Sequence, residues 1–576
     1  MGMCTLRPLV AATFMACALL IVIRSPLAVA DDHASQGVFG WLMYVPGEDG
    51  GPVGLLARVV VETNSSLLSS SPSCAEVTFS AADGAQPLLT VQRGNNPDPD
   101  LFPVIVCDAS VPFDTALSVY VGESESPVLE LRSASQAPGV LVTTADSGCR
   151  NPEEYPDVGC AFDTPAARLQ AWGATLQTAD PQPDAILHLG DYVYRHYKAD
   201  PANGVGVWKP EKHCALPAKY TSSNAADSNP AMSDRWSWWK WDWFMPTAPF
   251  LANFPWLLLR GDHEICSLSG PGFFFMLDVG SGNDGNGTLL ERSCPTQPTT
   301  ASNATITAEN FASVVEVLPP MHYKFPTETT PDYVALDTVQ FCEETVDQDV
   351  VELYLETYQD TLSSLADNST VCLSHKPLYF KRWDDSYNGT TLQALVEQTG
   401  VFTSGAFTHK CMYWSAAHAH LFQVLNFPDD PDIGASQTDR LRAGVAHFIT
   451  GAGGVNPDAV DEPGEQTFVV DGTPALVYTS GDMGVLHFTL SGPNGAAWDG
   501  SYAIAADPYN PSNAPMAPRL SCSFSLDEGH AGCESELQWQ LPPSFTLPPP
   551  SSGTAFLDAS LCLAVACVLL PVLLFL

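Results

Sequence analysis

One repeated pattern constrains this chain more than any other feature: short apolar runs that each end in an ionisable side chain. Four such runs end at Asp146, Asp191, Asp262 and His375, in the stretches "GVLVTTAD", "DAILHLGD", "PWLLLRGD" and "TVCLSH". Continuous apolar runs of this length are typical of strands buried on both faces, as in the parallel sheets of α/β proteins. Because ligands of open α/β sheets bind at the carboxyl ends of strands, the pattern predicts that these side chains share one edge.

The residue types at these predicted strand ends favour metal binding. Tyr194 follows Asp191 by three residues, and two histidines, His418 and His420, follow later in "SAAHAHLF". Carboxylates can bridge two cations, and imidazoles suit Zn, Fe or Mn. Three Asp, one Tyr and three His therefore predict a site for a pair of divalent or trivalent cations.

The order and spacing of these motifs resemble the calcineurin-like metallophosphoesterases. That family's pattern is D-x-H or D-x-G, then GDxxY, GNH(E/D), a lone His and GHxH, and the matching stretches are "ADSG", "GDYVY", "GDHE", "LSH" and "AHAH". The Tyr of the second motif is similar to the purple acid phosphatase branch, and "TADSGCR" resembles the first motif of secreted metallophosphatases with a GDTGCR-type sequence. Over roughly residues 55–490, the resemblance implies an α/β (α+β) fold, namely a four-layer metallophosphoesterase β-sandwich flanked by helices and preceded by a small all-β domain.

The resemblance also implies which side chains would hold each of two cations. The first cation would be held by Asp146, Asp191, Tyr194 and His420. Asp191 would bridge to the second cation, which would be held by Asp262, His375 and His418. A tyrosine ligand favours Fe(III) at the first position, and Zn, Mn and Fe(II) stay open for the second.

Further side chains are implied near the scissile bond. His263 would donate a proton or a hydrogen bond to the leaving group, and Glu264 would orient the His263 imidazole. Arg150 and Arg195 each follow a metal motif, and they could pair with a substrate phosphate or form surface salt bridges.

The chain departs from the family's pattern at two positions. The family's Asn is Asp262 here, which adds a negative ligand and should weaken the Lewis acidity of the second cation. The Gly of the last motif is Ala417, which demands ordinary backbone angles. Neither change removes a donor, so the resemblance still implies a metal site.

The implied chemistry is metal-assisted hydrolysis of a small phosphate ester. The favoured hypothesis is a secreted, surface-anchored phosphatase of acid phosphatase type, which hydrolyses phosphate monoesters by attack of a metal-activated water. A phosphodiesterase acting on nucleotides or phospholipid head groups would use the same metal site. A GPI-anchored binding protein that keeps the fold without catalysis is the third hypothesis. The sequence leaves these alternatives and the oligomeric state open.

Both ends of the chain resemble sorting signals. Residues 1–30 combine Arg7, an apolar run and "AVA", which is typical of a secretory signal peptide rather than of an uncleaved anchor. Small residues at Ser551, Ser552 and Gly553, a short spacer and an apolar terminus give the layout of a GPI-attachment signal rather than of a plain tail anchor, with residues 553–576 as the removed tail. We therefore expect the protein on the extracellular face of the plasma membrane, held by a C-terminal lipid anchor, or secreted. Sites for N-glycosylation fit secretion: Asn64, Asn286, Asn303, Asn368 and Asn388.

Between these signals the sequence predicts three regions. Residues 37–138 alternate short β-like runs with turn residues, as in a small β-sandwich domain. Residues 139–505 form the predicted catalytic domain, with an amphipathic helix expected over 164–181. Residues 506–552 are rich in Pro and Ser and predict a stalk.

Charge and cysteine content narrow the partners and the compartment. With 24 basic against 65 acidic residues, the chain carries a formal charge of −41, so binding of nucleic acid through a basic face is excluded. Twelve of the 16 cysteines lie between the predicted signals, an even number that suits an oxidising compartment. Cys74 and Cys107 are a plausible bridge, and Cys522 and Cys533 could close a short loop.

Overall fold

The fold is known from a computed structural model. It describes most of residues 33–148, 181–194, 234–294 and 317–426, residues 446–451, six strands between 464 and 534, and isolated positions between 169 and 179. All of these residues belong to one compact unit, residues 1–535. The predicted signal peptide, the GPI-attachment tail and most of the helix expected over 164–181 lie outside the described residues. Within the described part of the chain, no helix is long and apolar enough to cross a membrane.

An eleven-stranded sheet is the larger of two mixed sheets, with the order β24-β23-β22-β21-β8-β9-β10-β1-β2-β5-β4. Its central strands run parallel: β8 (Val140–Thr144), β9 (Ala185–His188), β10 (Pro255–Leu258) and β1 (Val38–Val45). Antiparallel strands extend it on both sides: β2 (Gly54–Glu62), β4 (Val91–Gln92), β5 (Val104–Ser110), β21 (Gly484–Ser491), β22 (Ala497–Ile504), β23 (Pro518–Ser525) and β24 (His530–Glu534).

The second sheet has eight strands in the order β11-β12-β13-β16-β18-β17-β20-β19. Its parallel centre consists of β12 (Asp332–Leu336), β13 (Thr370–Ser374), β16 (Cys411–Ala416) and β18 (Ala446–Thr450). Its other members are β11 (Met321–Tyr323), β17 (Phe422–Asn426), β19 (Gly464–Val470) and β20 (Thr473–Ser480). Two small sheets complete the strands: β3 (Val77–Ala81), β6 (Leu117–Val121) and β7 (Leu129–Leu131), and β14 (Tyr379–Lys381) with β15 (Ser386–Asn388).

The two large sheets share one hydrophobic core. Leu141 and Leu187 of the larger sheet lie in the same buried cluster as Val371 and Leu373 of the second. Their chain neighbours point the other way, as alternation along a strand requires, and Val142 packs in a separate cluster. Each sheet is therefore buried on both faces near its parallel strands, which explains why these strands read as continuous apolar runs.

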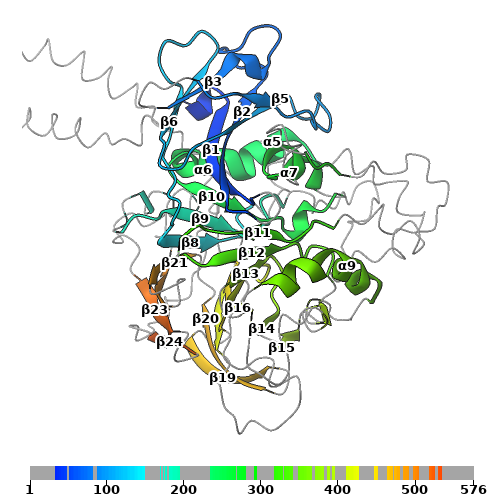
Figure 1. Cartoon of the computed structure of the whole chain (residues 1–576), viewed down its shortest axis with the longest axis vertical. Helices are drawn as coiled ribbons and strands as arrows, with labels where there is room; N and C mark the ends of the chain where they lie inside the picture. The colour runs from blue at the N-terminus through cyan, green and yellow to red at the C-terminus, as the bar shows by residue number, and fades with distance from the viewer. Residues whose placement is uncertain are drawn as a thin grey trace, which may run out of the picture. The chain divides into compact units, whose positions relative to one another are not determined.

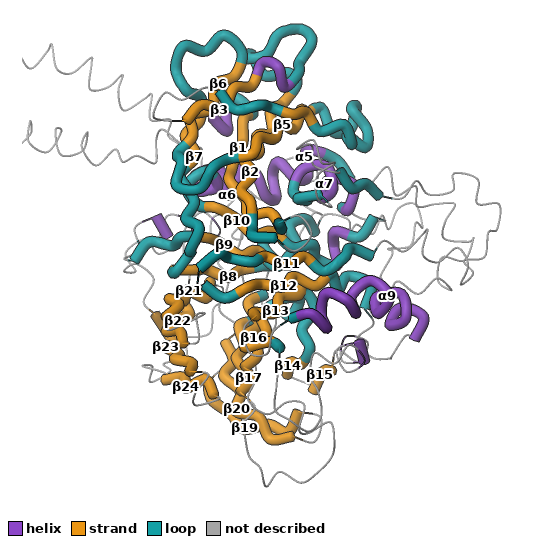
Figure 2. The backbone as a smooth tube through the Cα atoms, viewed as in Figure 1, coloured by secondary structure: helices purple, strands orange, loops and turns teal. Residues whose placement is uncertain are grey.

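Helices cover the remaining apolar faces (Figures 1 and 2). On the larger sheet lie α5 (Trp236–Trp239), the π-helical segment η8 (Lys240–Phe244), α6 (Met245–Leu251) and α7 (Gly270–Met276). Trp236, Trp239 and Trp243 recur at helical spacing and are buried there, so the Trp-rich segment serves packing. On the second sheet lies α9 (Gln348–Ser364), which buries Tyr354 and Tyr358 on one side.

The predicted mixed α/β class is confirmed at this coarse level. The four predicted apolar runs form β8, β9, β10 and β13. Residues 37–138 supply β1, β2, β4 and β5 to the larger sheet, where β1 pairs with β10, and form a separate sheet with β3, β6 and β7. Residues within the predicted stalk form β23 and β24 instead of irregular chain.

Disulfides tie neighbouring strands and loops together. The predicted bridge between Cys74 and Cys107 is confirmed. Two bridges that the sequence did not specify join Cys266 to Cys294 and Cys372 to Cys411. Cys522 and Cys533 face each other as Cα partners of β23 and β24, the register that a short closed loop requires.

Candidate metal centre

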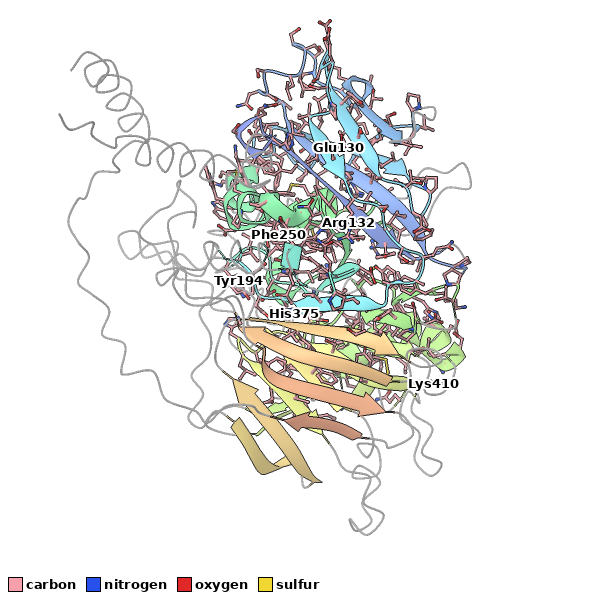
Figure 3. The ribbon with its side chains drawn as sticks, turned by 90° about the vertical axis from the view of Figure 1, so that its left-hand side faces the viewer. Glu130, Arg132, Tyr194, Phe250, His375 and Lys410 are labelled. Atoms are coloured by element: carbon pink, nitrogen blue, oxygen red, sulfur yellow. A yellow bond between two sulfur atoms is a disulfide. The ribbon has the colours of Figure 1, made fainter. Side chains whose placement is uncertain are left out.

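The predicted ligands converge where the parallel strands of both sheets end. Asp146, Asp191 and Asp262 follow β8, β9 and β10 of the larger sheet, and His375 directly follows β13 of the second. The last two, His418 and His420, lie in the loop between β16 and β17. Figure 3 shows Tyr194 and His375 near the boundary between the two sheets. The donors therefore come from two sheets and five separate strand ends or loops, as the sequence pattern predicts.

Tyr194 is the centre of the first group of donors. Its Oη lies 2.8 Å from Asp146 Oδ1, 2.8 Å from Asp191 Oδ2 and 3.2 Å from His420 Nε2. The phenol carries one proton, yet two carboxylates compete to accept it. A cation in place of that proton would satisfy the phenol and both carboxylates together. These are the four side chains that the family resemblance assigns to the first cation.

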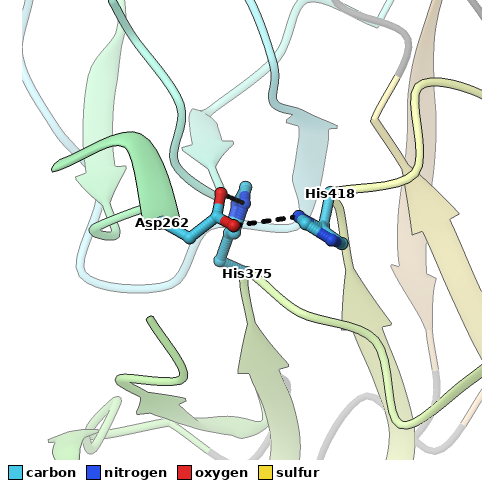
Figure 4. A group of neighbouring side chains, drawn as sticks. All are labelled: Asp262, His375 and His418. Atoms are coloured by element: carbon cyan, nitrogen blue, oxygen red, sulfur yellow. Dashed lines mark hydrogen bonds and ion pairs between the residues drawn. The ribbon is translucent and has the colours of Figure 1, made fainter. Parts of the chain in front are cut away.

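The second group joins Asp262, His375 and His418 (Figure 4). Asp262 Oδ1 lies 3.2 Å from His375 Nε2, and Asp262 Oδ2 lies 3.6 Å from His418 Nδ1. One potential ligand atom from each of the three buried residues lies within 4.8 Å of the others. Asp191 Oδ1 is 3.4 Å from His375 Nε2, so Asp191 touches both groups, as a bridging ligand must.

A backbone carbonyl orients the imidazole ring of His375. Its Nδ1 lies 2.8 Å from the carbonyl oxygen of Leu189, an acceptor, so Nδ1 carries the proton in that hydrogen bond. In the neutral ring, Nε2, which faces Asp191 and Asp262, would be the nitrogen with the lone pair, and the raised pKa of His375 means that a proton occupies it while no cation does. A carbonyl behind a ligating histidine is the usual outer contact of a metal site, because it sets the tautomer and the ring orientation.

Unusual backbone angles place three of the donors. Asp146, Asp191 and His418 have positive φ values of 52°, 60° and 68°. Non-glycine residues adopt this region at a cost of about 1–3 kcal/mol, and they persist there when the surrounding structure fixes them. The Asp146 carboxylate helps to do so, because its Oδ2 accepts the His418 N–H at 3.1 Å. Among the described residues, three of the four non-glycine residues with positive φ are therefore donors of this cluster, and the fourth is Asp114.

The glycines of the two Gly-Asp motifs allow these loops to touch. Gly190 has a φ of +105°, and a Cβ there would meet the Gly261 Cα at 2.5 Å. A Cβ on Gly261 would collide with Asp191 Oδ1. The His263 N–H donates to the same Asp191 Oδ1 at 3.0 Å. Glycine is therefore required at both positions for the β9 and β10 ends to meet.

Glu264 does not orient His263 as predicted. Its fully buried carboxylate instead accepts hydrogen bonds from the backbone N–H groups of Asp191 at 2.9 Å, Tyr192 at 2.9 Å and Gly261 at 3.0 Å. The side chain is part of the 3-10 turn η9 (Asp262–Glu264), and it ties that turn to the loop after β9. The prediction for Glu264 was wrong because its position next to His263 in the sequence does not determine which loop packs against η9.

His263 lies beside the donors at the edge of the first group. Its Nε2 is 3.8 Å from Asp191 Oδ2, and its ring lies 4.0 Å from the Tyr194 ring, centroid to centroid. The side chain is slightly exposed, at 8% of its surface, whereas the His375 side chain is completely buried. This position, beside the donor side chains and less completely buried than His375, suits contact with a bound molecule.

The electrostatics of the buried donors show a need for positive charge. Burial and the Asp191 carboxylate raise the pKa of Asp146 to about 8. Burial would lower the pKa of His375, but the carboxylates of Asp191 and Asp262 outweigh it and raise that pKa well above its usual value. Burial and the carboxylates of Asp146 and Asp191 also raise the pKa of Tyr194. Bound protons therefore offset the repulsion between the buried carboxylates, and cations could replace these protons at the same atoms.

Two of the predicted site residues stay untested, and one residue was missed. Arg150 and Arg195 lie outside the described residues. Lys376, which the sequence reasoning passed over, is buried with its Nζ 3.5 Å from Asp262 Oδ2. Its position directly after His375 is the sequence feature that could have identified it as part of the site. His188, which precedes the Gly190-Asp191 motif, is a core histidine buried between Tyr192 and Trp243.

A cavity of about 500 Å³ lies elsewhere in the unit. Glu130, Arg132 and Ala252 are among the residues that line it, and Figure 3 places Glu130 and Arg132 apart from Tyr194 and His375. The candidate centre is therefore defined by its converging donors rather than by this cavity.

Comparison with known proteins adds no assignment: the chain matches no protein-family model and no curated protein.

Proposed function

We propose that the protein is a metal-dependent phosphoric ester hydrolase of the calcineurin-like metallophosphoesterase type, close to the purple acid phosphatase branch, and that it acts on phosphate monoesters. One observation carries the proposal. Seven side chains that the motif pattern selects from the sequence, scattered over residues 146–420, lie in one buried cluster with contacts of 2.8–3.6 Å.

The packing of the unit supports the four-layer sandwich of that family. One hydrophobic cluster contains strands of both large sheets, a second joins the larger sheet to α5, α6 and α7, and a third joins the second sheet to α9. Helices, sheet, sheet and helix are the four layers that the resemblance implies. The position of the donors at the ends of the parallel strands also agrees with it.

The donor set fits two cations with different surroundings. Tyr194 and His420 belong to the first position and His375 and His418 to the second, with Asp191 between them. A phenol oxygen favours Fe(III) at the first position, and Zn, Mn or Fe(II) suits the second. When bound, two such cations would supply Lewis-acid stabilisation of phosphoryl oxygens and a water of lowered pKa.

The chain's own residues have separate tasks in this proposal. His263, whose Nε2 lies 3.8 Å from Asp191 Oδ2, would protonate the leaving oxygen through that nitrogen. Leu189 holds the ring of His375 so that Nε2 faces the cluster. Glu264 holds the Asp191 loop against η9 through backbone N–H groups. No covalent bond between phosphate and protein is required.

The location of the protein is a part of the same proposal. We infer secretion through residues 1–30 and a lipid anchor at the C-terminus, with small phosphate esters outside the cell as substrates. Release of the protein from intact cells by a phosphatidylinositol-specific phospholipase tests the anchor. Retention on the cells after that treatment would contradict it.

The activity is tested with a nitrophenyl monoester and its bis-ester. The purified protein is stripped with a chelator and reloaded with Fe, Zn or Mn, and turnover should be absent when stripped and return on reloading. His418→Ala should abolish turnover, whereas His322→Asn, in β11 with its ring 3.3 Å from Asp332, is the matched control and should not. Faster turnover of the bis-ester would favour the diesterase alternative. Tight cation binding without turnover of either ester would favour the third hypothesis, a binding protein that keeps the fold without catalysis.

A further inference from the structure

Lys376 places a buried ammonium group beside one half of the metal centre. The side chain is 2% exposed, and its Nζ donates to the Phe341 carbonyl at 2.9 Å and lies 3.5 Å from Asp262 Oδ2. The backbone holds the residue as well, because the Lys376 N–H donates to Thr338 Oγ1 at 2.9 Å and its carbonyl accepts from Ser374 Oγ at 2.7 Å. This lysine is therefore a fixed part of the site rather than a flexible surface chain.

The ammonium and a cation would compete for the same carboxylate. Asp262 Oδ2, the atom that Lys376 approaches, is also the atom nearest to His418 Nδ1, at 3.6 Å. Two positive charges that share a buried carboxylate repel each other strongly, because the interior screens charge less than water does. Since the pair centres on Asp262, the repulsion acts most on the cation position formed by Asp262, His375 and His418.

We propose that Lys376 is a built-in counter-ion of Asp262 that makes this second cation position the weaker of the two. The ammonium offsets the carboxylate when the position is empty of metal, and it lowers the affinity of the position for a divalent ion. The lysine thereby balances the extra negative charge that Asp262 brings. The inference deepens the proposed metal centre and depends on it.

The test is a zinc titration of the full-length protein against a competing chelator. The wild-type protein should take up two zinc ions in two resolved steps. Lys376→Met removes the charge and keeps an unbranched side chain only one heavy atom shorter, so it should tighten the weaker step by about tenfold or more, with little change in the tighter step. Lys376→Gln, which keeps a donor for the Phe341 carbonyl, carries the same expectation if the Met variant does not fold.

Two controls separate charge from packing. Lys376→Arg keeps the charge and should bind zinc with nearly wild-type affinity. Lys410→Met removes a lysine whose Nζ binds the carbonyls of Ser363 and Leu365 beyond the centre, and it should change neither step (Figure 3). A folded neutral variant at 376 with unchanged or weaker zinc affinity overturns this inference alone. No zinc uptake by the wild-type protein overturns the metal centre itself.

Discussion

Replacing Glu264 with alanine tests how the two Gly-Asp loops are held together. The carboxylate accepts three backbone N–H groups, from Asp191, Tyr192 and Gly261, at 2.9–3.0 Å in a fully buried position. A buried donor left without a partner costs about 1–3 kcal/mol, so the three together set an upper range of about 3–9 kcal/mol.

Part of this loss is offset. Burial and the Asp191 carboxylate raise the pKa of Glu264 to about 8, so Glu264→Ala also removes a costly acid from beside Asp191. Water can enter the space left behind and reach some of the N–H groups. We therefore expect a net decrease of about 2–4 kcal/mol in the free energy of unfolding, together with weaker cation binding as Asp191 loses its support.

The assay is urea denaturation of the metal-free and the metal-loaded protein, with bound metal measured in parallel. Glu264→Gln is the matched control, because its carbonyl oxygen can still accept the N–H groups of Asp191 and Gly261, which share Oε2. Its loss of stability should lie between those of the wild-type and alanine proteins. A decrease below about 1 kcal/mol for Glu264→Ala, with full metal content, would refute the role assigned to this side chain.

Three further predictions concern catalysis, the core and pH. His263→Ala should retain bound metal but lose about 10²–10⁴ of turnover, the usual contribution of a general acid, and equal loss of metal would show a ligand instead. Arg58→Met leaves the Asp108 carboxylate buried without the guanidinium that binds both of its oxygens at 2.6 and 2.7 Å. Because Arg93 Nη1 remains 3.5 Å from Asp108 Oδ2, the unfolding free energy in a denaturant titration should fall by at most about 3–5 kcal/mol, and no change would contradict the role of this pair. Burial raises the pKa of Asp234 from 3.8 to about 7, so this acid stabilises the fold at pH values below about 4 and the contribution is lost as the pH rises to about 7. Asp234→Asn should therefore flatten the decline of the melting temperature between those pH values, and an unaltered slope would show that Asp234 is not its source.

The strand ends could be predicted because both signals are local. An apolar run identifies a buried strand, and an ionisable residue at its end is costly to bury unless it is used. Asp146, Asp191, Asp262 and His375 satisfy both conditions, and β8, β9, β10 and β13 end just before them. The residue types at these strand ends were the basis for predicting a metal site, and the resemblance assigned each donor to one of two cations.

The remaining features depend on contacts that no local pattern contains. Glu264 meets the Asp191 loop because β9 and β10 are parallel neighbours, and Lys376 meets Asp262 because the two sheets pack face to face. In the same way β1 joins the larger sheet through β10, far along the chain, rather than closing a separate β-sandwich. Pairings of this kind are set by the tertiary fold, and the propensity of each segment is compatible with several of them.

The central claim, that seven side chains bind a pair of cations, is tested most directly by anomalous X-ray diffraction from crystals of the metal-loaded protein. We predict two anomalous peaks, one bounded by Asp146, Tyr194 and His420 and one by Asp262, His375 and His418, with Asp191 between them. A single peak at another place, or no peak while elemental analysis of the same crystals finds no bound metal, would contradict the claim.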